Sequence, residues 1–119
     1  MEFLNKIELK GVVGRAEVNN INGSQVCNFS VVTEYSTIDR ERNSIVETTW
    51  FNVSAWAGRD SITDLYSIQK GAWVHVIGRQ RARKYTAQTG EERTTTDVVA
   101  HTVKLIQKEE SQMQPQRDY

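Results

Sequence analysis

The sequence predicts an all-β domain of five strands, with one short helix between the third and the fourth strand. Two observations carry this prediction. Most of the chain alternates between apolar and polar residues with a period of two, which is the pattern of strands with one buried face. One segment, 60–71, instead repeats its apolar residues at helical spacing and ends in glycine, which is typical of a helix and its C-terminal cap.

The first two strands are predicted to form a hairpin. Apolar residues alternate over 7–14, and the glycine at the end of that run permits a bend or a bulge. Asn22-Gly23 predicts a tight turn, because both residues tolerate positive φ. The second strand follows over about 26–35. It carries the single cysteine, Cys27, among apolar neighbours, so we expect a buried thiol.

A polar run over 37–46 predicts a long, mobile hairpin loop before the third strand, which covers about 47–56. The apolar face of this third strand alternates with a polar face. Trp50 and Trp56 both fall on the polar face, so we expect the two indole rings to stand outside the core. A strand can bury such rings in the barrel or in a subunit interface instead, and for Trp56 this alternative weighs as much as a functional one.

The remaining elements complete the fold. The helix over 60–71 can be capped by Asp60 or Ser61. The fourth strand covers 73–86 with a bulge at Gly78, and the last strand covers about 93–106. Five strands with a helix between the third and the fourth are typical of the OB-fold, a Greek-key barrel that binds oligonucleotides or oligosaccharides. We expect this domain over 1–106 and a polar, disordered tail over 107–119.

The composition of the chain limits the classes of function that it can have. The formal net charge is +0, so any binding to a polyanion must come from local clustering of cations. The sequence contains no long apolar run that would span a membrane, and it begins without the pattern of a signal peptide. One cysteine cannot form an internal disulfide, which fits a reducing cytoplasm. Two histidines and one cysteine give no convincing metal site, and no cofactor motif is present, so we expect no enzyme.

The strongest functional signal lies in the fourth strand. Arg79, Arg81, Arg83 and Tyr85 occupy alternate positions, so three guanidiniums and one aromatic ring line a single face, with Lys84 on the other. Phosphates along a backbone and flat bases that stack would suit this face, and single-stranded nucleic acid offers both. The alternative is a solvated edge strand whose charges discourage aggregation.

Two further cations are weaker candidates for the same role. Arg59 follows Gly58 at the end of the third strand, and Lys6 precedes the first strand. Either side chain can be an ordinary surface charge. The interpretation as phosphate contacts therefore depends on where the fold places them.

An ordered set of segments resembles the bacterial single-stranded DNA-binding proteins of the SSB family. The matching runs extend over about residues 5–106, which is nearly the whole predicted domain. They are Asn5-Lys6-Ile7-Glu8-Leu9-Lys10-Gly11-Val12-Val13-Gly14, Val26-Cys27-Asn28-Phe29-Ser30-Val31-Val32-Thr33, Glu47-Thr48-Thr49-Trp50-Phe51-Asn52-Val53, Lys70-Gly71-Ala72-Trp73-Val74-His75-Val76-Ile77-Gly78, Arg79-Gln80-Arg81-Ala82-Arg83-Lys84-Tyr85-Thr86, Thr89-Gly90 and Thr94-Thr95-Thr96-Asp97-Val98-Val99-Ala100.

The resemblance implies a homotetramer that wraps single-stranded DNA during replication, recombination and repair. It implies base stacking at Trp50, Trp56 and Tyr85, with a further stacking position at Tyr35 or its neighbour Ser36. Arginines at the positions of Arg79, Arg81 and Arg83 would contact phosphates or rings. The chain departs from the family at Phe51, where many members have histidine. It also lacks the acidic C-terminal tip through which many members dock replication and repair proteins, so it resembles a short form.

Three alternatives remain open at this point. RNA is not excluded as a ligand, because stacking and phosphate contacts do not read the sugar. A primosomal restart protein also uses an OB-fold, and weaker basic clustering would favour it. An OB-fold that serves mainly protein–protein contact would be favoured if Trp50, Trp56 and Tyr85 were buried.

Overall fold

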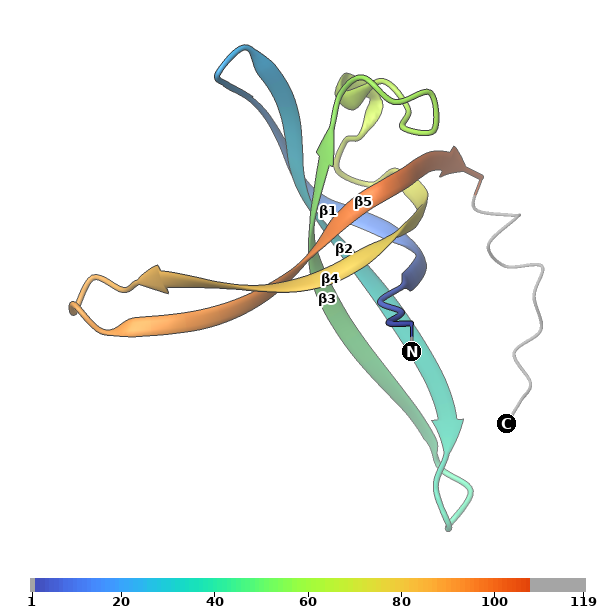
Figure 1. Ribbon diagram of the computed structural model, residues 1–119. Helices are drawn as coiled ribbons and strands as arrows, with labels where there is room; N and C mark the ends of the chain where they lie inside the picture. Colours follow the sequence, from blue (N-terminus) through green and yellow to red (C-terminus); the bar gives the residue numbers. More distant parts are fainter. Residues whose placement is uncertain (1, 108–119) are drawn as a thin grey trace.

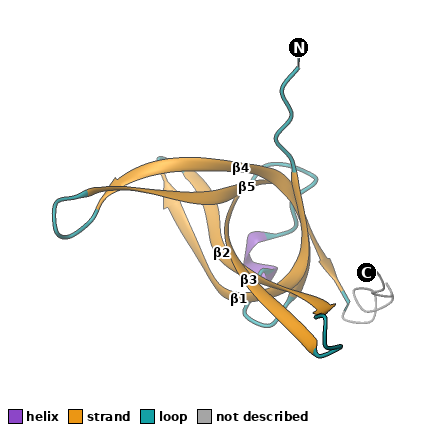
Figure 2. Ribbon diagram, turned by 90° about the horizontal axis from the view of Figure 1, so that it is seen from below, coloured by secondary structure: helices purple, strands orange, loops and turns teal. Residues whose placement is uncertain are grey.

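Five strands close into one barrel in this computed structural model, which describes residues 2–107 (Figure 1). Their order around the barrel is β1-β2-β3-β5-β4, which confirms the predicted OB-fold. Figure 2 looks into the ring that they form. The elements are β1 (Ile7–Ile21), β2 (Ser24–Ile38), β3 (Ser44–Trp56), the 3-10 turn η1 (Leu65–Ser67), β4 (Trp73–Thr86) and β5 (Glu92–Ile106).

β1 pairs with its two neighbours along different parts of its length. Its first half pairs with β4 and its second half with β2, both antiparallel. Between the halves the register shifts at Gly14, which confirms the predicted bulge, although the strand continues to Ile21. The barrel closes through β3 and β5, which run parallel and pair only at Val53↔Val98 and Ser54↔Val99.

The core is small and rich in valine. β-Branched side chains suit the pleated, tightly curved strands of a small barrel. Cys27 lies in this core with no exposed surface, as predicted, and burial raises the pKa of its thiol. The valines with almost no exposed surface are Val13, Val26, Val31, Val53, Val74, Val76, Val98 and Val103.

The predicted helix over 60–71 is wrong in kind. Only the three residues of η1 are helical, and Figure 2 shows this turn across the opening of the barrel. Ile62, Leu65 and Ile68 are buried at a spacing of three, which a 3-10 turn satisfies. The segment is bound to β5 instead, because Ile62 forms a parallel bridge with Val103. Asp64, not Asp60 or Ser61, accepts the capping hydrogen bond.

The turns follow the local sequence. Asn22 and Gly23 have φ of 52° and 84°, which confirms the tight β1–β2 hairpin. The predicted long loop over 37–46 is wrong, because the strands continue on both sides. The turn covers only residues 39–43, where the N–H of Asn43 donates to Asp39 Oδ1 at 2.8 Å.

The β2–β3 and β4–β5 hairpins both project from the barrel in Figure 1. We name them the β2–β3 arm (residues 34–48) and the β4–β5 arm (residues 79–97). The bulge predicted at Gly78 is confirmed at the root of the second arm. A Cβ at this position would lie 2.2 Å from the carbonyl oxygen of Val99, so the close approach of β4 and β5 requires glycine.

Two expectations concern what the described residues contain. Within residues 2–107, no helix is long and apolar enough to cross a bilayer. The same residues hold no cluster of three or more histidine, cysteine, aspartate or glutamate side chains suited to a metal ion. The predicted tail falls almost entirely on residues 108–119, which lie outside the described part of the chain.

Candidate nucleic-acid interface

The arginines of β4 lie on one face of the β4–β5 arm, as the alternation predicts. The pairing with β5 is regular from Arg79 to Thr86, so no bulge disturbs their phase. Tyr85 follows on the same face and is 45% exposed. Lys84 lies on the opposite face of the arm, so it is separated from the arginines and from Tyr85.

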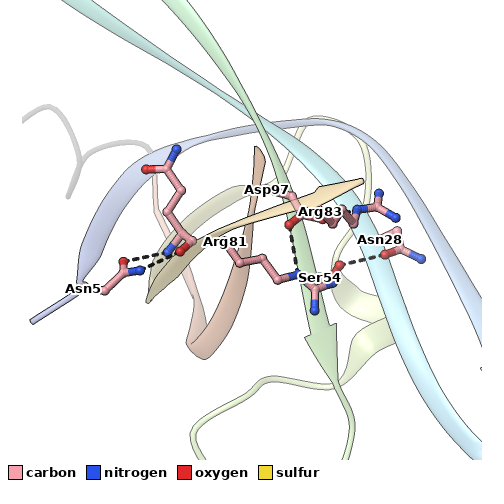
Figure 3. A network of polar contacts seen from close by, with 7 residues as sticks. Asn5, Asn28, Ser54, Arg81, Arg83 and Asp97 are labelled. Atoms are coloured by element: carbon pink, nitrogen blue, oxygen red, sulfur yellow. Dashed lines mark hydrogen bonds and ion pairs between the residues drawn. The ribbon is translucent and has the colours of Figure 1, made fainter. Parts of the chain in front are cut away.

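Two of these arginines share one buried carboxylate. Arg81 Nε lies 3.1 Å from Asp97 Oδ1, and Arg83 Nε lies 3.1 Å from Asp97 Oδ2. Figure 3 shows both guanidiniums converging on Asp97, which is only 5% exposed. Each arginine engages the carboxylate through Nε, which leaves its terminal Nη groups available as donors to a phosphate.

The two ion pairs with Asp97 reduce the positive charge of the predicted arginine face. Asp97 offsets one of the two charges beside it, so the group carries about one net positive charge, and Arg79 adds another. The carboxylate also fixes the two guanidiniums, which lowers the entropy lost when they bind a ligand. Sequence reasoning gave Asp97 no role. Its role becomes apparent only from the β4–β5 register, in which Asp97 pairs with Arg81.

Trp50 stands on the outer face of β3 and is 59% exposed. Its ring reaches across β2 to the bulge of β1, since a Cβ on Gly14 would lie 2.5 Å from Trp50 Cζ3 and 3.1 Å from Ser30 Oγ. The absence of a side chain at Gly14 therefore makes room for the edge of the indole. The contact limits the motion of the ring and leaves much of its surface open to a base.

Trp56 lies on the same face of β3, six residues farther along, and is 38% exposed. A strand rises about 3.3 Å per residue, so the two tryptophans are about 20 Å apart along β3. Both rings lie outside the core, as the sequence predicts, and Tyr85 is exposed too. Burial of these three side chains would have favoured the protein-interaction alternative, and the structure does not give it that support.

A polar groove separates the two tryptophans. Its volume is about 210 Å³, and Asn52 and Ser54 line it from β3. Ser54 Oγ donates to Asn28 Oδ1 at 3.0 Å, which leaves the Asn28 amide nitrogen as a donor. We call it the inter-tryptophan groove; its lining residues are Arg15, Asn28, Phe29, Asn52, Val53, Ser54, Arg83 and Asp97.

The groove joins the two halves of the interface. Arg83 and Asp97 come from the β4–β5 arm, whereas Asn52 lies on the strand that carries both tryptophans. Sequence reasoning missed the amides and the serine. The signal was available, because Asn52 and Ser54 share the period-two face of Trp50 and Trp56.

The structure separates Tyr35 from the other aromatic residues. Tyr35 pairs with Glu47, whereas Trp50 pairs with Val32, so the two rings point to opposite faces of the β2–β3 ribbon. Tyr35 is 61% exposed. It is open to solvent but does not extend the face that carries Trp50 and Trp56.

Lys6 and Arg59 are brought together with Arg79. All three line one pocket at the end of the arginine face nearest the barrel. None of them takes part in an ion pair within residues 2–107. Lys6 and Arg59, each a weak candidate from the sequence alone, therefore form a cluster with Arg79 of the arginine face.

His75 pairs with an acidic residue, whereas His101 lines the same pocket as Lys6, Arg59 and Arg79. His75 Nε2 lies 2.6 Å from Glu8 Oε2 on the β1–β4 side of the barrel. This hydrogen bond lowers the pKa of the Glu8 carboxyl. The pair is a local contact between neighbouring strands.

Comparison with known proteins agrees with this geometry. The model of the Single-strand binding protein family matches residues 4–106. The chain belongs to this family. It is 39% identical over 105 residues to the single-stranded DNA-binding protein of Neisseria meningitidis, and 31% identical to that of Xanthomonas campestris. Each alignment covers 87% of this chain and 60% of the relative, so the chain spans about three fifths of these proteins.

Solved structures of the family share the fold. The Plasmodium falciparum SSB, in complex with ssDNA, superposes with a TM-score of 0.71 at 24% identity, over 89% of this chain and 96% of that one. A deletion mutant of the single-stranded DNA binding protein from Thermus aquaticus has a TM-score of 0.71 at 18% identity, over 88% and 51%. At these identities the likeness establishes the OB-fold alone.

Proposed function

We propose that the chain binds single-stranded DNA without reading its sequence. The observation that carries this proposal is the pair of exposed tryptophans, Trp50 and Trp56, on one face of β3 with a polar groove and Arg83 between them. Exposed indole rings suit the flat faces of unpaired bases, and the arginine suits the phosphates between those bases. Family membership and the named relatives support the same conclusion.

The binding energy comes from two sources in this proposal. Stacking on an aromatic ring contributes about 1–3 kcal/mol per base and tolerates any base. Contacts with phosphates release counterions, so affinity falls as salt rises. The residues proposed to contact the strand are Trp50, Trp56, Tyr85, Tyr35, Arg79, Arg81, Arg83, Lys84, Arg59 and Lys6.

The wider role is part of the same proposal. A protein that coats single strands keeps them from pairing again, which serves replication, recombination and repair in the cytoplasm of a bacterium. The chain acts as a binding protein and not as an enzyme. It assembles as a homo-oligomer, most simply the tetramer that the family resemblance implies. Light scattering of the purified chain measures this assembly, and a monomer at micromolar concentration would contradict it.

Intrinsic fluorescence tests the function directly. Oligo-dT is titrated into the full chain at several salt concentrations, with a duplex of equal length as the control. We expect strong quenching by the single strand, little by the duplex, and weaker binding as salt rises. Oligo-U in a parallel titration compares RNA with DNA. If neither oligo-dT nor oligo-U quenches or binds, the proposal is wrong and a protein ligand becomes the better hypothesis.

A further inference from the structure

A pocket of about 390 Å³ lies beside the arginine face, where the N-terminal segment crosses β4 and β5. Asn5 fixes this segment. Its Nδ2 donates to the carbonyl oxygen of Gln80 at 2.7 Å, and the N–H of Gln80 donates to Asn5 Oδ1 at 3.0 Å (Figure 3). These two bonds lie two positions beyond the last β1–β4 pair, Ile7↔Gly78, so the segment forms a fixed wall. We call this cavity the N-terminal pocket.

The floor and one side of the N-terminal pocket are apolar. Val99 and Ala100 of β5 and Ile77 of β4 line it, and Leu4 contributes a side chain that is 87% exposed. An uncovered leucine beside a hollow is apolar surface that a ligand can cover. The volume falls within the range of sites that bind small molecules, which are lined mainly by apolar groups with a few polar ones.

The rim of the N-terminal pocket is cationic. Lys6, Arg59 and Arg79 line it, and no acidic residue does so within the described chain. Arg79 differs here from Arg81 and Arg83, because no carboxylate is paired with it in residues 2–107. The rim therefore suits an anion, whereas the floor suits a flat apolar group.

We propose that the N-terminal pocket holds one nucleotide of the bound strand, its base against Leu4 and Val99 and its phosphate at Arg59 and Arg79. This inference rests on the proposed function and assigns a site to it. No tryptophan, tyrosine or phenylalanine lines the pocket. His101 also lines the pocket, so its imidazole ring can add a stacking contact to the apolar ones, and the pocket extends the path of the strand past Arg79.

The experiment measures anisotropy of an end-labelled oligo-dT and of an equally long strand of abasic sugar-phosphate units. Leu4→Ser removes apolar surface from the pocket without changing the charge, and Leu4 is exposed enough for the fold to tolerate it. We expect binding about five-fold weaker on oligo-dT and unchanged on the abasic strand. Phe3→Ser is the matched control, because Phe3 is 93% exposed but does not line the pocket.

Arg59→Ala tests the rim. We expect weaker binding to both strands and a salt dependence, as log K against log salt, that is lower by about 0.7. Arg40→Ala, in the β2–β3 turn, is the control and leaves both unchanged. Quenching of tryptophan at saturation stays at its wild-type level in the Leu4 and Arg59 variants, because the pocket contains no tryptophan.

The outcomes separate this inference from the proposed function. If the wild type fails to bind oligo-dT, the proposed function itself is wrong. If the wild type binds and Leu4→Ser matches Phe3→Ser, no base occupies the pocket and the inference is overturned. If Leu4→Ser weakens both strands equally, the leucine acts on the backbone or the fold, and the base assignment is again overturned.

Discussion

The two arms have nearly the same construction and opposite chemistry. Both are antiparallel ribbons that extend the strands of the barrel beyond its core. The β4–β5 arm carries five cations and three acids over 79–97, whereas the β2–β3 arm carries two cations and four acids over 34–48. The first arm also has a buried charge at its root, and the second presents exposed apolar side chains: Tyr35, Ile38, Ile45 and Val46.

The difference indicates how one ribbon is adapted to a polyanion. In the β4–β5 arm, Asp97 binds two guanidiniums at their inner nitrogens and leaves the outer ones exposed. In the β2–β3 arm, Arg40 and Arg42 belong to a turn that Asp39 organises through Asn43. Both arms contain arginines, but only in the β4–β5 arm do they lie on a common face beside the inter-tryptophan groove.

The largest expected effect is at the root of the β4–β5 arm. Asp97→Asn removes the charge that two arginines share, so they face each other with only an amide between them. Loss of one partner from a buried pair costs about 3–5 kcal/mol, and the half-exposed arginines reduce this to about 2–3 kcal/mol. Urea unfolding measures it. A loss below about 0.5 kcal/mol would show that Asp97 contributes little to the arm.

Removing arginines from the two arms compares their roles in binding. Arg79→Ala with Arg83→Ala should lower the salt dependence of log K by about 1.4, which corresponds to roughly 25-fold weaker binding at 0.1 M salt. Arg40→Ala with Arg42→Asn is the matched control. Asparagine suits the positive φ of Arg42, 70°. Equal losses in the two double variants would show that both arms contact phosphates.

The tyrosines of the two arms should also differ in their contribution to binding, with the larger contribution from the β4–β5 arm. Tyr85→Ala is expected to weaken binding of oligo-dT by about 1–2 kcal/mol through loss of one stacked base. Tyr35→Ala should cost less than half as much, because its ring points away from the face of Trp50. Anisotropy titrations at one salt concentration measure both. A larger loss at Tyr35 would place the strand on the other face of the β2–β3 ribbon.

A smaller effect is expected where Trp50 meets the barrel. Gly14→Val places side-chain atoms where the indole edge now lies. The ring must turn away, so its emission should shift and binding should weaken by roughly 1 kcal/mol, a part of one stacking contact. Because the obstructing atoms belong to the edge of an exposed side chain and not to backbone, stability should change little. Gly11→Val is the contrast, since its Cβ would lie 2.2 Å from the backbone oxygen of Val32 and should disrupt the barrel.

The smallest effect concerns pH at the tip of the β2–β3 arm. The N–H of Asn43 donates to the Asp39 carboxylate, and this hydrogen bond lowers the pKa of Asp39. A lowered pKa stabilises the fold above the unfolded-state value of about 3.9, and this contribution is lost as pH falls through the folded value. Asp39→Ala should therefore be less stable than wild type at pH 7. The gap in urea midpoint should shrink as the pH falls below the unfolded-state value and Asp39 is protonated, and a constant gap would contradict this.

Local signals in the sequence predicted much of the fold. The Asn22-Gly23 turn, the Gly78 bulge and the outer position of the tryptophans depend on backbone preference and a period of two, which neighbouring residues determine. The helix over 60–71 could not be resolved in this way. Apolar residues at 62, 65 and 68 suit an α-helix or a 3-10 turn, and the parallel bridge to Val103 decides between them.

The residues of the candidate site also fall into two groups, those that local sequence predicted and those that depend on tertiary contacts. Period two placed the arginines, Tyr85 and the tryptophans on their faces. It could not place Asp97 beneath Arg81 and Arg83, since that contact depends on the register of two strands joined by a separate turn. The pocket formed by Lys6, Arg59 and Arg79 unites three segments distant in sequence. Only the closed barrel brings those segments together.

The closure of the barrel has a mechanical consequence. β3 and β5 join through two residue pairs, whereas β4 and β5 pair along their full length. Opening the ring at this seam breaks the fewest backbone bonds, so the amide hydrogens that are bonded between β3 and β5 should exchange early. Ser54 from β3 and Asp97 from β5 line the inter-tryptophan groove on the two sides of the seam. A DNA strand bound in the groove would contact both β3 and β5. Its binding would therefore slow the local opening of the barrel at this seam.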